Sequence, residues 1–255
     1  MLVPVSINDA EPAEFILDTG ASISLLTPEL AARLGIAPTA TREARGAAGT
    51  VTVALASVKS LALGQARLED VPVAITDDLH RIGAAVGAAI NGDIGYNVLK
   101  HFRLRIDYAR SRLHLSRREP GAIDPGGVRF TLAHPEKPLV LVPARVNGRG
   151  PFQFALDTGA SRTVIAPDLA RSLGITSVAD DPLTAGGGRV ASSLGWVDVL
   201  AVGTARVEHL TVAVADFLVM LSDAIGTRLD GIVGYNFLRE FTVTIDYPAE
   251  TLWLE

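Results

Sequence analysis

The chain alternates short apolar runs with glycine, proline and polar residues, a pattern typical of β-strands joined by turns. The clearest runs are rich in Val, Ile and Leu and span Val51–Leu63, Val71–Ile75, Val190–Val202 and Leu210–Val214. They are short, and turn-forming residues separate them. The pattern therefore predicts a mainly β protein.

Short helices are expected at a few places between these strands. Thr27 precedes Pro28, and Gly35 follows an apolar segment, which is the order of an N-cap, a first helical turn and a C-terminal stop. A second copy of this arrangement has Pro167 near its start and Gly174 at its end. A further short helix is predicted after each of two asparagines, because Asn is a favourable N-cap. These asparagines are Asn97 and Asn236.

The whole pattern occurs twice. Leu17–Ser22 recurs as Leu156–Ser161, 139 residues later, and Gly95–Asn97 recurs at the same spacing. An ungapped alignment of residues 1–116 with 140–255 gives 46 identical positions, far too many for chance. The chain is therefore an internal duplication. It predicts two lobes, 1–116 and 140–255, joined by a connector, 117–139, that is rich in Pro, Gly and charge, with pseudo-twofold symmetry between the lobes.

Composition excludes several classes of protein. With 48% hydrophobic and 20% charged residues the chain can bury a core, and its formal net charge of −5 does not suit a nucleic-acid partner. The absence of Cys removes disulfides, Cys nucleophiles and thiolate metal sites. The five His share no ligand-like spacing, so no metal site is expected. No apolar run reaches the roughly 18 residues of a membrane span, and Leu2–Val5 predicts an opening strand instead of a signal peptide.

Each copy carries one Asp-Thr-Gly directly after an apolar strand, with the acid at Asp18 and at Asp157. A carboxylate delivered by a buried strand is costly unless it is paired, solvated or hydrogen-bonded. If a pseudo-twofold axis passes near both loops, the two acids meet, share a proton and can exchange protons with water and a substrate carbonyl. The alternative is a turn in which Asp caps its own backbone. Both copies kept the acid while most positions diverged, which favours catalysis.

These motifs resemble the retropepsin-like aspartic proteases, with two such domains fused in one chain. In that family a hydrophobic strand leads into Asp-Thr-Gly-Ala, and a later Ile/Val-Gly-x-Asn/Asp leads into a short helix. The matching segments here are Asp18–Ala21 with Ile94–Asn97, and Asp157–Ala160 with Val233–Asn236. The resemblance implies a closed β-barrel lobe with one or two short helices per copy, and an active site at the lobe interface. It also implies a monomer that forms the pseudo-dimer within one chain, without a cofactor.

The resemblance also assigns roles to individual residues. Asp18 and Asp157 would hold and activate the attacking water. Thr19 and Thr158 would fix the two acids across the axis. Gly20 and Gly159 would let the substrate backbone lie close, and Ser22 and Ser161 would line the cleft wall. Two glycine-containing hairpin tips would close over the substrate as flaps: Ala47, Ala48 and Gly49 in the first copy, and Gly186, Gly187 and Gly188 in the second. An ordinary hairpin turn is the alternative for each tip.

The sequence therefore predicts an aspartic endopeptidase that hydrolyses an extended peptide. The alternatives are a catalytically silent bilobal module that binds peptide, and an enzyme that needs processing or a partner. Pepsin-like enzymes usually have Ser where this chain has Ala21 and Ala160, so activity is expected to extend to less acidic pH than in pepsin. Bacterial relatives of this type are commonly exported, which favours a periplasmic or secreted location over the cytoplasm.

Three other features receive structural interpretations. Asp107-Tyr108 and its repeat Asp246-Tyr247 are expected to stabilise the turn before the last strand of each copy. Trp196, on the strand after the second tip, is expected to pack in the core, with contact to substrate as the alternative.

Overall fold

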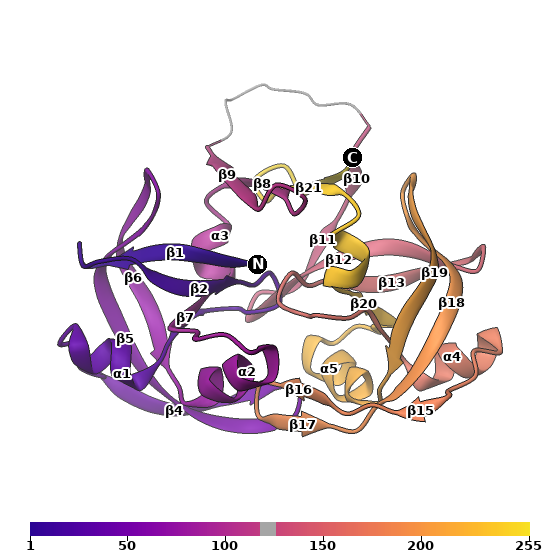
Figure 1. The fold of residues 1–255 in the computed structure, drawn as a ribbon, viewed down its shortest axis with the longest axis horizontal. Coiled ribbons are helices and arrows are strands. Elements are labelled where there is room, and N and C mark those ends of the chain that lie inside the picture. Colours follow the sequence, from indigo (N-terminus) through magenta and orange to yellow (C-terminus); the bar gives the residue numbers. More distant parts are fainter. Residues whose placement is uncertain (118–125) are drawn as a thin grey trace. The chain divides into compact units, whose positions relative to one another are not determined.

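The computed structural model describes residues 1–117 and 126–255, so part of the predicted connector, 118–125, lies outside the described residues. The described chain forms two compact units (Figure 1). The first contains Met1–Leu99 and Thr184–Val190, and the second contains Lys100–Leu183 and Ala191–Glu255. Both units are built mainly from strands, which confirms the predicted fold class.

The first unit is a closed sheet with short helices. Its strands are ordered β1-β2-β7-β3-β6-β5-β4, and β1 also pairs with β5, which closes the sheet into a barrel. The strands are β1 (Leu2–Ile7), β2 (Ala13–Leu17), β3 (Ser24–Leu26), β4 (Ala40–Gly46), β5 (Gly49–Leu63), β6 (Ala66–Ile75) and β7 (Gly92–Ile94). The helices are α1 (Pro28–Arg33), α2 (Asp78–Val86) and α3 (Tyr96–Leu99).

The second unit repeats this barrel. Its strands are ordered β11-β12-β13-β20-β14-β19-β18-β15, and an additional β12–β18 pairing closes the sheet. The strands are β11 (Thr131–His134), β12 (Lys137–Val146), β13 (Arg149–Leu156), β14 (Val164–Ile165), β15 (Ala179–Asp180), β18 (Ser193–Val202), β19 (Ala205–Val214) and β20 (Gly231–Val233). The helices are α4 (Pro167–Leu173), α5 (Phe217–Ile225) and α6 (Tyr235–Leu238).

Two smaller sheets complete the fold. A sheet ordered β10-β22-β21-β8-β9 lies within the second unit, and β16 pairs with β17 in a short hairpin. Their strands are β8 (Arg103–Asp107), β9 (Arg112–Ser116), β10 (Val128–Arg129), β16 (Leu183–Ala185), β17 (Gly188–Val190), β21 (Thr242–Asp246) and β22 (Thr251–Leu254). Because β8 pairs with β21, the end of the first sequence copy belongs to the second compact unit. The first compact unit thus ends at Leu99, apart from residues 184–190, whereas the first sequence copy ends at residue 116. The predicted lobe boundaries stay a prediction.

Equivalent strands of the two copies have the same register. In the first unit β2 pairs in parallel with β7, and Leu17 lies opposite Ile94. In the second, β13 pairs in parallel with β20, and Leu156 lies opposite Val233. All four side chains are fully buried. The residue that follows each of these central strands is therefore held by the most rigid part of its barrel.

The predicted caps of α1 and α4 are confirmed. The Thr27 hydroxyl accepts a hydrogen bond from the Leu30 N–H at 3.3 Å, and Pro28 is the first residue of α1. At the end of α4, Gly174 takes the left-handed conformation with a φ of 69°. Local sequence chemistry was sufficient here, because both caps involve only neighbouring residues.

The prediction that Asn97 and Asn236 cap their helices is wrong. Helix α3 begins at Tyr96 and α6 begins at Tyr235, so each Asn lies inside the first turn of its helix. Both side chains bond to a distant strand instead. The structure also adds α2 and α5, one helix per copy that the sequence pattern did not predict.

The interpretation of the Asp-Tyr pairs is confirmed for the two aspartates, and that of Trp196 is wrong. Asp107 accepts the Arg110 N–H at 2.9 Å, and Asp246 accepts the Ala249 N–H at 2.9 Å, each inside the turn before the last strand. Trp196 is 50% exposed on β18, because it points to the outer face of a strand whose neighbours Gly195 and Val197 are buried.

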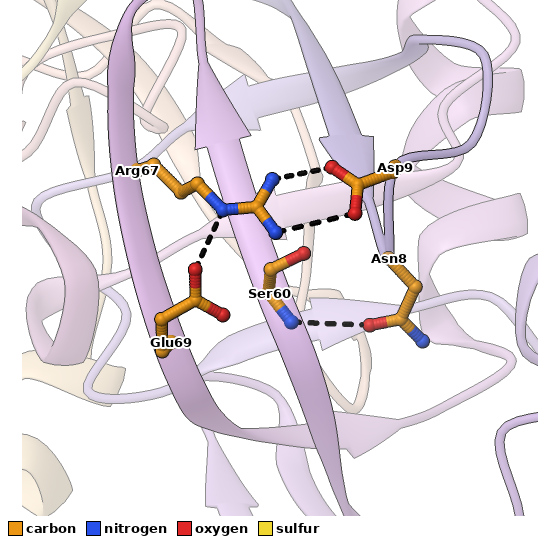
Figure 2. Close-up of polar contacts among 5 residues, drawn as sticks. All are labelled: Asn8, Asp9, Ser60, Arg67 and Glu69. Carbon is orange, nitrogen blue, oxygen red and sulfur yellow. Dashed lines mark hydrogen bonds and ion pairs between the residues drawn. The ribbon is translucent and has the colours of Figure 1, made fainter.

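A polar cluster on the first barrel ties the β1–β2 turn to the β5–β6 hairpin (Figure 2). Arg67 forms an ion pair with Asp9 and a hydrogen bond to Glu69 at 2.6 Å. Beside it, the Asn8 side chain accepts the Ser60 N–H at 3.1 Å. All of these charged side chains lie at the surface, so the cluster holds two turns together.

In the described part of the chain, no helix has the length and apolar character that a membrane crossing requires.

Candidate active site

Asp18 is held at the end of β2 by backbone hydrogen bonds. Its N–H donates to the carbonyl oxygen of Ile94 at 3.0 Å, which continues the β2–β7 pairing past the end of the strand. Its carboxylate Oδ1 accepts the N–H of Gly20 at 2.6 Å. Asp18 is half-buried, and Thr19 beside it is buried. The loop thus fixes the carboxylate but leaves part of it accessible.

Asp157 is held in the same way in the second unit. Its N–H donates to the Val233 carbonyl at 3.0 Å, and its Oδ1 accepts the N–H groups of Gly159 at 2.8 Å and Ala160 at 3.0 Å. Asp157 is half-buried and Thr158 is buried. Both loops therefore turn back on their own carboxylate and hold it through the same oxygen, Oδ1.

An asparagine links the segments that adjoin the first acidic loop. Asn97 Oδ1 accepts both the N–H of Ser24 at 2.8 Å and its hydroxyl at 2.9 Å, while Asn97 Nδ2 donates to the Pro72 carbonyl at 2.8 Å. The Ser24 hydroxyl in turn accepts the Gly95 N–H at 3.0 Å. One amide side chain therefore links α3, β3 and β6.

The second copy repeats these links with a conservative change. Asn236 Oδ1 accepts the N–H of Thr163 at 2.7 Å and its hydroxyl at 2.9 Å, and Asn236 Nδ2 donates to the Thr211 carbonyl at 2.7 Å. The Thr163 hydroxyl accepts the Gly234 N–H at 3.2 Å. The positions are those of Asn97, Ser24, Pro72 and Gly95 moved by 139 residues. The same frame thus carries both acidic loops.

The remaining predicted loop residues differ in exposure. Gly20 and Ser22 are half-buried in the first loop, whereas Gly159 and Ser161 are exposed in the second. Each set lies within one loop of one unit. The approach of Asp18 to Asp157, on which catalysis would depend, stays a prediction.

Both glycine-containing stretches form hairpin turns. Ala47 and Ala48 join β4 to β5, and Gly186 and Gly187 join β16 to β17. Residues 184–190 belong to the first compact unit, so the two tips lie in the same unit. The Ala48 N–H donates to the Gly186 carbonyl at 2.9 Å. Their contact with a substrate stays a prediction.

Tyr108 is a neighbour of Asp157 that the sequence analysis missed. It comes from the turn after β8, and its ring meets the ring of Tyr235 edge-on at 5.4 Å between centroids. Within the described residues its hydroxyl is buried and has no hydrogen-bond partner. Burial raises the pKa of the Tyr108 phenol, and the nearby Tyr235 and Asp157 raise it further. The repeated Asp-Tyr motif does not predict that Tyr108 lies near Asp157. That proximity depends on the pairing of β8 with β21, which join distant parts of the sequence.

Replacing Tyr108 by Phe is expected to leave the free energy of unfolding unchanged or to raise it by about 1 kcal/mol. The change removes a buried hydroxyl without a partner, and such a group costs about 1–3 kcal/mol. Urea titration of both proteins measures the difference. Tyr235→Phe, at a 38% exposed residue, is the control and should change the free energy by less than about 0.5 kcal/mol. A loss of more than about 1 kcal/mol in Tyr108→Phe would show that the hydroxyl is bonded.

No group of three or more His, Cys, Asp or Glu that could hold a metal ion occurs in the parts of the chain that the structure describes.

Comparison with known proteins gives the same family twice. Residues 3–98 and 142–237 each match a family model described as Aspartyl protease. Among solved structures, a retropepsin-like aspartic protease from Rickettsia conorii matches with 23% sequence identity and a TM-score of 0.31, covering 45% of this chain and 79% of the other. No curated protein sequence matches the chain significantly. The two matched segments are 139 residues apart, so each sequence copy carries the family pattern.

Proposed function

Because the chain belongs to the aspartyl protease family through both of its copies, we propose that it is an aspartic endopeptidase in which Asp18 and Asp157 activate one water molecule. The observation that carries the proposal is the duplicated loop. Each acid follows a buried central strand and accepts backbone N–H from its own loop, and an asparagine bonds to the residue that follows each loop, Ser24 or Thr163. Both copies kept the acid while most aligned positions diverged, which favours catalysis over a turn in which Asp only caps its own backbone.

In the proposed reaction the two carboxyl groups share one proton. The ionised carboxylate takes a proton from water as its oxygen attacks the peptide carbonyl carbon, and the protonated one donates to the carbonyl oxygen. Return of a proton to the peptide nitrogen then allows the C–N bond to break. The products are a new carboxyl end and a new amine, and the two acids exchange roles without any covalent intermediate.

The surrounding residues have supporting roles in this proposal. Thr19 and Thr158 fix the two acids, Gly20 and Gly159 allow the substrate backbone to approach, and Ser22 and Ser161 line the cleft wall. The hairpin tips at Ala47–Gly49 and Gly186–Gly188 close over an extended peptide and pair with its backbone, as an added strand would.

The test is cleavage of a denatured protein between about pH 3 and pH 7, with and without pepstatin. Cleavage that pepstatin blocks is expected, and in heavy-oxygen water each new carboxyl end should carry one heavy oxygen atom. Specific activity should not depend on protein concentration, since one chain supplies both acids. Saturable peptide binding without any cleavage would instead support the catalytically silent binding module, and cleavage only after processing would support a precursor.

Placing Ser at positions 21 and 160 is expected to move the acid limb of the pH–rate profile to lower pH. A hydroxyl at each position can donate to the neighbouring catalytic carboxylate, and a hydrogen bond to the charged form favours ionisation. A hydrogen bond is worth about 1 kcal/mol and one pH unit about 1.4 kcal/mol, so the double variant Ala21→Ser/Ala160→Ser should shift by roughly 0.5–1 unit. The measurement is kcat/KM against pH. An unchanged acid limb would contradict the explanation.

A further inference from the structure

Asp78 is a buried acid far from both predicted catalytic acids in sequence, and it contacts the second hairpin tip. It is the first residue of α2 and is 7% exposed. One carboxylate oxygen forms an ion pair with Arg81 on the next turn of the helix, and the other accepts the Gly187 N–H at 2.8 Å. All three residues belong to the first compact unit. Burying a carboxylate is favourable only when such partners satisfy it.

The hairpin tip is shaped to reach this carboxylate. Gly187 has a φ of 95° and Gly188 a φ of 141°, conformations that side chains with a Cβ rarely adopt. A Cβ at Gly187 would come within 2.9 Å of the backbone of Gly49, and one at Gly188 would lie 3.5 Å from the Arg81 guanidinium. The tip therefore approaches both α2 and the first hairpin with bare backbone.

The hydrogen bonds continue from one tip to the other. The Gly186 carbonyl, directly before the Gly187 donor, accepts the Ala48 N–H at 2.9 Å. Figure 1 draws β16 and β17 beside the end of β4, as these contacts require. A series of contacts thus runs from α2 through Asp78 and residues 186–187 to the first tip.

This arrangement is not duplicated in the sequence. The positions 139 residues after Asp78 and Arg81 are Phe217 and Met220, which carry no charge. The tips differ as well, because Gly186 and Gly187 align with Ala47 and Ala48. The first copy alone therefore has the charged pair on α2, and the second copy alone has the glycines at its tip that fit this pair. A general structural need of the barrel would have been met in both.

We propose that Asp78 is a positioning residue that anchors the second hairpin tip, so that the backbone of residues 186–188 is held ready for the substrate. The structural part of this proposal concerns the first unit alone, and its catalytic consequence rests on the proposed function. Without the anchor, the tip is correctly placed for only part of the time and must become ordered when the peptide binds. The apparent affinity for the peptide is then reduced in proportion to that fraction.

Amide hydrogen exchange measured by mass spectrometry tests the anchor without any activity assay. Asp78→Ala is expected to speed exchange in residues 184–190 about tenfold, because it removes a hydrogen bond to a charged acceptor. Asp78→Asn keeps an acceptor oxygen and should restore slow exchange. Asp77→Ala removes the adjacent acid, which is 85% exposed, and should leave exchange as in the wild type. Exchange in β5 and β6, which belong to the same compact unit as Asp78 and the tip, reports whether that unit is still folded.

Exchange in residues 184–190 that is unchanged in Asp78→Ala would overturn the proposal. If that variant does not fold, Gly187→Ala tests the same contact from the other side, since its Cβ meets the Gly49 backbone. It should speed exchange in the tip, and a wild-type rate there would also overturn the anchor.

With a cleavable peptide, Asp78→Ala should raise KM about tenfold with kcat nearly unchanged, and Asp78→Asn should restore KM. If the wild type cleaves nothing, the proposed function fails while the exchange result still decides the anchor. A loss confined to kcat would contradict a positioning role.

Discussion

Replacing Asp157 by Asn is expected to lower peptide hydrolysis by about 10²–10⁴-fold, the usual contribution of a general acid–base group. Asn cannot take a proton from water, so the water attacking the peptide would no longer be activated. The same loss is expected for Asp18→Asn, because the proposed reaction uses both acids in every cycle. Combining the two changes should cost little more than either alone, since residues that act as a unit are not additive.

These variants should keep the fold. The amide oxygen of Asn can still accept the N–H groups that bond to each carboxylate, at Gly20 in the first loop and at Gly159 in the second. Thermal unfolding should therefore change little. Lost activity in a folded protein would separate a catalytic role from a structural one.

Two other acids serve as matched controls. Asp9 and Asp168 are exposed, one in each unit, and each is paired with an arginine at the surface. Asp9→Asn and Asp168→Asn should retain wild-type kcat/KM. Equal rates of cleavage by Asp157→Asn and the wild type would contradict the mechanism with two catalytic acids. A large loss of kcat/KM in either control would contradict it as well.

The sequence predicted best what depends on neighbouring residues or on the repeat. Thr27 caps α1 and Gly174 ends α4 because both act within one helical turn. The two acidic loops could be found because the same motif occurs twice after an apolar strand. Comparing the copies highlights what they share.

The features it missed depend on contacts between distant segments. Asn97 is a good local cap, yet its side chain bonds to Ser24 and Pro72 on other strands, so tertiary hydrogen bonds outweighed local preference. Helix α2 is rich in Ala and Gly beyond its first turns, which hid its amphipathic pattern. Tyr108 lies near Asp157 because β8, the strand before it, pairs with β21.

Asp78 was missed for the opposite reason. It aligns with Phe217, so a search for shared residues passes over it. A search for charged residues present in one copy alone would have found it. In a duplicated protein, shared positions indicate the common frame and the common chemistry, whereas unshared polar positions indicate where the two copies have taken different tasks.

Replacing Gly234 by Ala is expected to lower the free energy of unfolding by about 3 kcal/mol or more, although Ala usually favours stability over Gly. Gly234 is buried directly after β20, and a Cβ there would lie 2.5 Å from the backbone carbonyl group of Arg162 and 2.8 Å from the Thr163 nitrogen. Backbone atoms cannot turn aside as a flexible side chain can, so the loop that carries Asp157 must move. Activity should fall with stability, because Tyr235, the next residue, donates its N–H to Ala160 in that loop at 2.8 Å.

Gly174→Ala in the same unit isolates this steric effect. Gly174 has a φ of 69°, and no atom lies within 4 Å of the place that a Cβ would occupy. Gly174→Ala should therefore lower the free energy of unfolding by about 1 kcal/mol, through the strain of the left-handed backbone conformation alone. Urea titration of the two variants and the wild type measures both costs, and kcat/KM at a temperature where all are folded measures the effect on the loop. Equal losses of the free energy of unfolding in the two variants would mean that the Arg162–Thr163 backbone can shift without a measurable loss of stability. The close approach of β20 to the acidic loop would then not be what holds Asp157 in place, and the shared frame of the two copies would have to rest on Asn97 and Asn236 instead.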